Sequence, residues 1–240
     1  MNMKKISFYT FLILSLSFIP VTAGNSSSLN ASGLKEALNV GIKNTITKVS
    51  KTNGYFSDAA IKILLPEEAQ KIVNNLKLIL GGEKMVNDVV LRMNRAAEDA
   101  AKEATPIFVK AITGMSFSDA TSILMGKNDA ATTYLKKTTF SQLTAAFRPK
   151  IKTSLDKPLV GNISTNQSWK KLTTSYNKVA KSTVGKLYNM KAINTNLDQY
   201  VTEKALNGMF IKLAEEEKSI RTNPAARVTG LLKSVFGALD

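Results

Sequence analysis

Residues 86–107 read VNDVVLRMNRAAEDAAKEATPI, and this stretch decides the fold class. Its apolar residues recur at alternating steps of four and three positions, which is the spacing of one face of an α-helix. They are Val86, Val90, Met93, Ala97, Ala100, Ala104 and Ile107. The centre of this face is rich in alanine, so a neighbouring helix can approach it closely. Pro106 predicts an end or a kink of the helix near Thr105.

The same helical period dominates the rest of the chain. Further helices are predicted over residues 34–49, 66–80, 107–115, 118–126, 128–138, 140–155, 169–187, 198–217 and 224–236. The β-like run Ala60 to Leu65 has no pairing partner, so we expect an extended connector near residues 54–65 that lies over the core. A loop is predicted over residues 157–167. The predicted fold class is therefore all-α, with a single bundle-like domain over residues 32–240.

The N-terminus has the pattern of an export signal. Lys4 and Lys5 precede the apolar run Ile6 to Val21, and small residues lead up to Ala23. An uncleaved membrane anchor is the alternative, but the run is short for a bilayer span and contains Pro20. We expect a signal peptide over residues 1–23, a flexible leader over residues 24–31, and a periplasmic or secreted protein. No later apolar run has the length of a transmembrane span.

The composition excludes several chemistries. The chain contains no cysteine and no histidine, which removes thiol nucleophiles, disulfides, the usual zinc ligand sets and the side chain best suited to proton transfer at neutral pH. Matches to S-x-x-K at Ser168 and Ser175 lack the accompanying K-T-G and are expected by chance in a segment rich in lysine and serine. We predict no catalytic residue, no metal site and no cofactor.

Two polar stretches are candidates for a binding cluster. Arg95, Glu98 and Lys102 recur at helical spacing opposite Met93, so they form either a solvated ion-pair face or a covered polar network. Three consecutive acids end at Glu217 and are either a solvated helix face or a cation site. The predicted cluster consists of Asn94, Arg95, Glu98, Asp99, Glu217 and Arg221.

Positive charge is concentrated in one part of the chain. Residues 127–191 contain thirteen Lys or Arg but only two acids, whereas the flanking segments are close to neutral. Lys170, Lys171, Lys178 and Lys181 lie on one side of a predicted helix, opposite Trp169. This face is either a solubilising surface or a patch that contacts anions. For an exported protein the available polyanions are anionic lipid and envelope polysaccharide, and intracellular nucleic acid is out of reach.

Several short motifs, in this order, resemble one bacterial family. They include GLKEAL at 33–38, GYF at 54–56, NRAAEDA at 94–100, PIF at 106–108, YVTEKAL at 200–206 and EKSIR at 217–221. The chain is similar over residues 33–237 to the family catalogued as domain of unknown function 4197. The resemblance implies an exported bacterial helical protein and supplies no catalytic residues. The charge excess of residues 127–191 is not part of these motifs.

Three functional hypotheses follow from the sequence. The first is a non-enzymatic binding protein of the cell envelope that contacts anionic lipid or polysaccharide through its basic helices. The second is a helical carrier of an apolar ligand, based on the methionine- and alanine-lined faces. The third is a carboxylate-dependent, glycan-cleaving enzyme in which Glu98 or Glu217 acts as the acid, which requires a raised pKa in a cleft.

Overall fold

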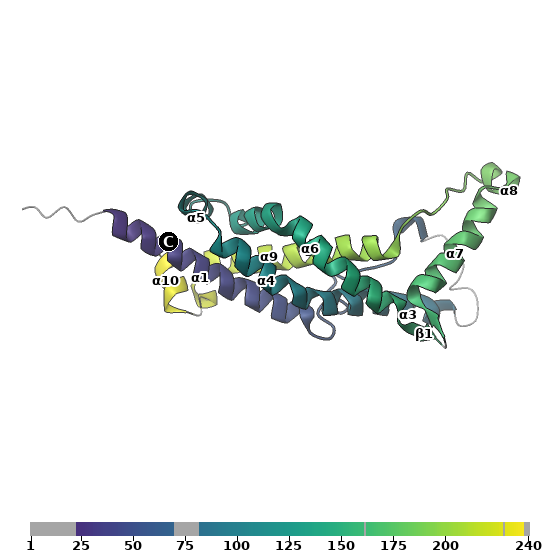
Figure 1. The fold of residues 1–240 in the computed structure, drawn as a ribbon, viewed down its shortest axis with the longest axis horizontal. Helices are drawn as coiled ribbons and strands as arrows, with labels where there is room; N and C mark the ends of the chain where they lie inside the picture. The colour runs from purple at the N-terminus through teal and green to yellow at the C-terminus, as the bar shows by residue number, and fades with distance from the viewer. Residues whose placement is uncertain (1–22, 70–81, 161, 228, 238–240) are drawn as a thin grey trace, which may run out of the picture.

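Long helices run side by side along an elongated bundle in the computed structural model (Figure 1). The structure describes residues 23–69, 82–160, 162–227 and 229–237. The α-helices are α1 (Ala23–Ser50), α3 (Gly82–Ala100), α4 (Ala104–Thr113), α5 (Phe117–Leu124), α6 (Ala130–Asp156), α7 (Thr165–Ala180), α8 (Thr183–Leu187), α9 (Leu197–Thr222) and α10 (Gly230–Gly237). Short 3-10 turns cover η1 (Glu67–Ala69), η2 (Ala101–Glu103) and η3 (Pro224–Ala226). The predicted all-α bundle is confirmed.

The alanine-rich face of the fold-deciding stretch lies in the core. Met93, Ala97, Ala100 and Ala104 are fully buried, and α6 packs along α3 and α4. The helix breaks at η2, slightly before the position predicted from Pro106. Proline cannot donate a backbone hydrogen bond to the carbonyl four residues earlier, and its ring crowds that carbonyl. This carbonyl belongs to Lys102, which explains why the tightened turn covers residues 101–103.

The connector between α1 and α3 starts with tight turns and becomes extended at Lys62. Ile61, Ile63 and Leu65 are buried, while Leu64 between them is 55% exposed. This alternation is that of an extended chain with one face on the core. Gly54 makes the preceding turn possible, because a Cβ atom there would lie 2.5 Å from the carbonyl oxygens of two α1 residues. The predicted connector is therefore present and lies on the core, but it is extended only from Lys62, since residues 54–61 form turns rather than the predicted extended chain.

Several element boundaries differ from those predicted. Helix α1 begins at Ala23 and so includes residues 24–31, for which we expected a flexible leader. That segment contains no proline, and it continues the axis of a helix whose later turns are packed. Helix α6 is a single helix in place of the two predicted over residues 128–138 and 140–155, and it continues through Pro149. The predicted signal peptide (except Ala23) and helix 66–80 (except its first turn) lie outside the described residues.

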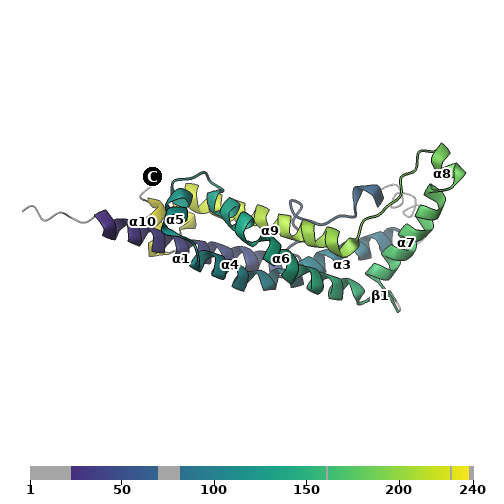
Figure 2. The same cartoon turned by 45° about the horizontal axis from the view of Figure 1, so that its top comes forward.

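Residues 157–196 project from one end of the bundle (Figures 1 and 2). The predicted loop contains a small antiparallel hairpin of β1 (Pro158–Val160) and β2 (Ile163–Ser164), with Pro158 opposite Ser164. The predicted helix 169–187 is divided into α7 and α8 at Lys181 and Ser182. We call α7, α8 and the return segment 188–196 the arm. Among the described residues, no helix combines the length and the hydropathy needed to cross a membrane.

Candidate functional site

Glu98 on α3 holds the turn that follows α1. Its side chain is almost fully buried, and its Oε1 atom accepts hydrogen bonds from the backbone N–H groups of Tyr55 at 3.1 Å and Phe56 at 3.2 Å. Arg95 donates from Nη1 to Glu98 Oε2 at 2.6 Å and from Nη2 to Asn53 Oδ1 at 2.7 Å. Both carboxylate oxygens therefore have hydrogen-bonding partners, and Arg95 supplies the opposite charge that a buried carboxylate requires.

Asn94, one turn earlier on α3, holds the extended connector. Its Oδ1 atom accepts from the Ile63 N–H at 2.9 Å, and its Nδ2 atom donates to the Ile63 carbonyl at 2.8 Å and to the Val90 carbonyl at 2.7 Å. The carboxamide therefore takes the place of a neighbouring strand. Asp99 lies outside this network and pairs at the surface with Lys102 at 2.9 Å. The hydrogen bond from Lys102 is the main cause that lowers the pKa of Asp99.

Tyr55 is fully buried at the centre of the same region. Its hydroxyl donates to the Ala205 carbonyl on α9 at 2.7 Å. Burial raises the pKa of Tyr55 far above its ordinary value, and the charge of Glu98 raises it further. The residue is therefore a neutral donor that links the turn to α9. Gly208 gives its ring room, because a Cβ atom at that position would lie 3.0 Å from the ring.

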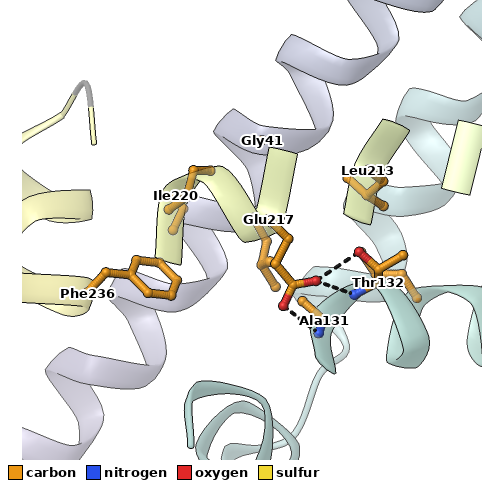
Figure 3. A pocket seen from close by; sticks show the side chains of 10 residues that line it. Gly41, Ala131, Thr132, Leu213, Glu217, Ile220 and Phe236 are labelled. Carbon is orange, nitrogen blue, oxygen red and sulfur yellow. Dashed lines mark hydrogen bonds between the residues drawn. The ribbon is translucent and has the colours of Figure 1, made fainter. Parts of the chain in front are cut away.

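Glu217 on α9 caps the N-terminus of α6. Its Oε1 atom accepts from the Ala131 N–H at 2.9 Å, and its Oε2 atom accepts from the N–H and the hydroxyl of Thr132, each at 2.8 Å (Figure 3). The first N–H groups of a helix have no partner within the helix and carry partial positive charge. The buried carboxylate satisfies both needs. The N-cap residue Asp129 makes no capping hydrogen bond of its own, so the cap of α6 comes from a different helix.

Two buried arginines serve helix C-termini in the same way. Arg221 donates from Nε to Glu217 at 3.0 Å, and its two Nη atoms donate to the carbonyls of Leu124 at 3.1 Å and Ile123 at 2.7 Å, at the end of α5. Arg227 donates to the carbonyls of Ile220 and Arg221 at the end of α9. Each guanidinium group therefore lies at a helix C-terminus, where the carbonyls of the last turn carry partial negative charge.

The six predicted cluster residues divide into two separate networks. Asn94, Arg95 and Glu98 contact the connector and its turn, Glu217 and Arg221 join α5, α6 and α9, and no hydrogen bond or ion pair among the described residues links the two groups. The run of acids does not converge either, since Glu215 pairs with Lys212 and Glu216 with Lys48. Within the described chain, no group of three or more carboxylates is arranged to hold a metal ion.

A small apolar cavity lies beside Glu217 (Figure 3). Its volume is about 20 Å³, and its walls come from α1, α6, α9 and α10. This is space for about one water molecule, whereas pockets for organic ligands measure roughly 300–1,000 Å³. A hollow of about 370 Å³, which is partly open to solvent, also lies between the connector and α9. The methionine- and alanine-rich face on which the carrier hypothesis rested is packed against α6.

The arm presents the predicted lysine face to solvent. Lys170, Lys171 and Lys178 on α7 and Lys181 at its end are exposed, whereas Trp169 is 7% exposed and donates from Nε1 to the Thr195 carbonyl at 2.9 Å. Ion pairs of these four lysines are absent from the described part of the chain. From Lys157 to Asn196 the sequence has seven lysines and no acid, so the arm has no carboxylate of its own.

The other half of the basic segment is partly neutralised. Residues of α6 pair with acids from distant parts of the chain: Arg148 with Asp198 at 3.6 Å and Lys150 with Glu103 at 3.0 Å. The positive surplus that the sequence assigns to residues 127–191 is therefore concentrated structurally in the arm. This division could not be read from residue counts, because it depends on which helices α6 packs against.

Asn177 is the main residue that sequence analysis missed as an anchor of the arm. Its Nδ2 atom donates to the Ile193 carbonyl at 2.8 Å, and its Oδ1 atom accepts from the Ile193 N–H at 2.7 Å. It thus holds the return segment to α7 as Asn94 holds the connector to α3. An asparagine within a predicted helix, facing an apolar residue of a neighbouring extended segment, is a weak signal for such a bridge.

Comparison with known families gives one finding. Residues 24–237 match the family described as "Protein of unknown function (DUF4197)". Comparison with curated proteins and with solved structures gives no match. The match covers the bundle and the arm, from the start of α1 to the end of α10.

Proposed function

The chain belongs to the family of proteins of unknown function DUF4197, so the family supplies no role for it. From the charge distribution on its surface, we propose that it is an exported, non-enzymatic binding protein whose arm contacts polyanions of the cell envelope. The lysines of the arm supply the attraction, and anionic lipid or envelope polysaccharide supplies the negative charge. Export is part of this proposal and rests on the signal-like residues 1–23.

The observation that carries the proposal is the unneutralised charge of the arm. Seven lysines occur between Lys157 and Asn196 without one acid, and the lysines of α7 are exposed on one side. Lysine suits diffuse attraction to a polyanion, because its ammonium group is a point charge without the fixed fork geometry of arginine. Each lysine close to an anionic surface adds about 1 kcal/mol. Four lysines therefore correspond to roughly three orders of magnitude in affinity at low salt.

The two alternatives have less support in the geometry. An enzyme that uses Glu98 or Glu217 as acid needs a proton on that carboxyl group and room for a substrate. Both oxygens of each carboxylate already accept hydrogen bonds, mainly from backbone N–H groups, so neither carboxylate presents a free oxygen to a substrate. A carrier needs an enclosed space much larger than the cavity beside Glu217.

The test compares two sets of lysine substitutions. The arm variant replaces four lysines of the arm with glutamine: Lys170, Lys171, Lys178 and Lys181. The control variant also uses glutamine and replaces four lysines that are exposed on the bundle: Lys51, Lys110, Lys218 and Lys233. Both variants lose the same net charge. We expect the arm variant to lose about a hundredfold or more in affinity for dextran sulfate and for vesicles containing phosphatidylglycerol, and the control to lose less than tenfold.

Raising the salt from roughly 0.05 to 0.5 M should release the unaltered protein, because the Debye length falls to a few ångströms. Unfolding curves of both variants should match that of the unaltered protein, which confirms that only the surface has changed. Equal loss in the two variants, or salt-insensitive partitioning to vesicles of neutral phosphatidylcholine, would contradict the proposal.

A further inference from the structure

Exposed apolar side chains gather at the end of the arm. Among the described residues, ten large hydrophobic side chains are exposed, and four of them lie within residues 179–188. They are Val179 (49%), Val184 (58%), Leu187 (81%) and Tyr188 (72%). Single exposed apolar residues are common on protein surfaces, but a cluster of them marks a contact surface.

We call residues 179–190 the tip of the arm. Hydrogen bonds within the tip hold its backbone in one conformation. Ser182 caps the N-terminus of α8, since its hydroxyl accepts from the Gly185 N–H at 3.2 Å. Gly185 packs on the end of α7, where a Cβ atom would lie 2.3 Å from the Val179 carbonyl oxygen. The chain then turns back, and the Met190 N–H donates to the Gly185 carbonyl at 2.8 Å. Leu187 and Tyr188 are thus held outward by a hydrogen-bonded turn.

Lysines alternate with these apolar residues along the sequence of the tip. Lys178, Lys181, Lys186 and Lys191 are exposed in the same part of the arm, and the nearest acid along the chain is Asp198. In Figures 1 and 2, α8 lies at the far end of the arm, away from α5 and α10 at the opposite end of the bundle. The bundle therefore does not obstruct a flat surface that approaches the tip.

We propose that the tip is a membrane-interface anchor. In this proposal Leu187 and Tyr188 enter an anionic phospholipid bilayer at the boundary between headgroups and acyl chains, while the lysines of the tip contact the phosphates. The inference rests on the proposed function and narrows its partner to lipid. A polysaccharide needs the charge but offers no apolar layer for Leu187. Tyrosine is favoured at the membrane interface, where its ring is buried and its hydroxyl remains hydrated.

Charge complementarity also identifies the bilayer as the occupant rather than a second copy of the chain. Two tips in contact would bring together lysines from both copies without a carboxylate from either arm, and like charges at short distance repel. An anionic bilayer instead satisfies both features of the tip at once. Apolar side chains and cations on one surface are the usual composition of segments that lie in the interface plane.

The absence of cysteine from the sequence allows a direct test. Leu187→Cys introduces a single thiol at the tip, which is labelled with the fluorophore NBD. Met125→Cys, directly after α5 at the opposite end of the molecule, is the matched control because Met125 is 73% exposed. On addition of vesicles of phosphatidylcholine with phosphatidylglycerol, we expect a blue shift and a rise in NBD emission at position 187, with quenching by spin-labelled lipid, and no change at position 125.

A second measurement tests the energetic role of the tip. Leu187→Ser with Tyr188→Ser keeps every lysine, and the control Phe117→Ser with Met125→Ser removes exposed apolar area from α5. We expect the tip variant to bind anionic vesicles about tenfold or more weakly and to keep its affinity for dextran sulfate. The control should bind both as the unaltered protein does.

The outcomes separate this inference from the proposed function. If the protein binds anionic vesicles and dextran sulfate while NBD at position 187 stays in water, the anchor is overturned and the polyanion-binding role remains. Binding to dextran sulfate without binding to vesicles also overturns the anchor, and it indicates that the polyanion is a polysaccharide. If the protein binds neither, both proposals fail. Concentration-dependent self-association that is lost in the tip variant would assign the tip to a second copy and overturn the anchor.

Discussion

The bundle and the arm use charged residues in opposite ways. In the bundle, Glu217 and Arg221 are buried, and their partners are the ends of α6 and α5. In the arm, Lys170, Lys171 and Lys178 point to solvent and are without an ion pair among the described residues. A buried charge is maintained only when its partners satisfy it, whereas an exposed charge is retained without any intramolecular partner. The first arrangement stabilises the fold, and the second leaves interactions free for a partner.

This difference separates two kinds of substitution. Replacing a buried charge should change the free energy of unfolding and leave the arm surface unaltered. Replacing an arm lysine should change binding and leave the unfolding transition in place. The following predictions test whether the two regions are as distinct as the contacts indicate.

The largest effect on stability is expected for Glu217→Ala. The substitution leaves the N–H groups of Ala131 and Thr132 without an acceptor and leaves Arg221 without its counter-charge. Removing one partner from a buried pair costs about 3–5 kcal/mol. Urea unfolding followed by circular dichroism measures the loss. Glu203→Ala, an exposed carboxylate on the same helix, is the control and should cost less than about 0.5 kcal/mol. A loss at Glu217 no larger than at Glu203 would show that the cap contributes nothing.

The next prediction compares the two asparagine bridges. Asn94→Ala leaves the N–H and the carbonyl of Ile63 without a partner in the core, and we expect a cost of about 2–3 kcal/mol in global unfolding. Asn177→Ala removes the same pair of bonds from Ile193, where the site is only partly buried. Water can replace some of these bonds, so the cost should be about 1 kcal/mol.

Hydrogen exchange distinguishes the two bridges further. Asn177→Ala should increase exchange in residues 188–196 while α6 and α9 stay protected, because the arm contacts the bundle through few elements. Asn94→Ala should increase exchange in α3, α6 and the connector together. If Asn177→Ala destabilised α6 and α9 as strongly as the return segment, the arm would unfold together with the bundle, and the two would not be distinct regions.

The fold class was predictable from the sequence because helical periodicity is local. The stripe from Val86 to Ala104 fixes a buried face without knowledge of its neighbours. Boundaries set by single residues were less accurate: the capping box of Ser116 and Asp119 starts α5 at Phe117, one residue before the predicted start at 118, and α7 ends before α8 because Ser182 starts a new cap.

The candidate site was less predictable than the fold. The sequence identified Glu98 and Glu217 as candidate acids, but the backbone N–H groups that Glu217 caps are 85 and 86 residues away. Whether such a carboxylate caps a helix or faces a cleft depends on tertiary contacts that periodicity does not contain. The lysine face of α7 was predictable because helix geometry alone places those side chains together. The apolar tip was not, because the helical period that starts at Trp169 continues through Leu187 and predicts an inward side chain, whereas Ser182 starts a separate helix and Leu187 is exposed.

The smallest expected effect concerns Asp58, which joins the turn after α1 to α9 through Lys212 at 2.9 Å. Partial burial acts to raise the pKa of Asp58, but the hydrogen bond from Lys212 and that from the Ala60 N–H outweigh it, so the pKa lies below its ordinary value of 3.8. A carboxyl group with a lowered pKa in the folded state stabilises the protein above its unfolded pKa, and this contribution disappears as the pH falls through the folded value. Because the pair is partly exposed, we expect less than about 1 kcal/mol. The difference in unfolding free energy between the unaltered protein and Asp58→Asn should be constant above about pH 5 and decrease below about pH 4. A difference that grows toward acid pH would reverse the sign and show that burial dominates.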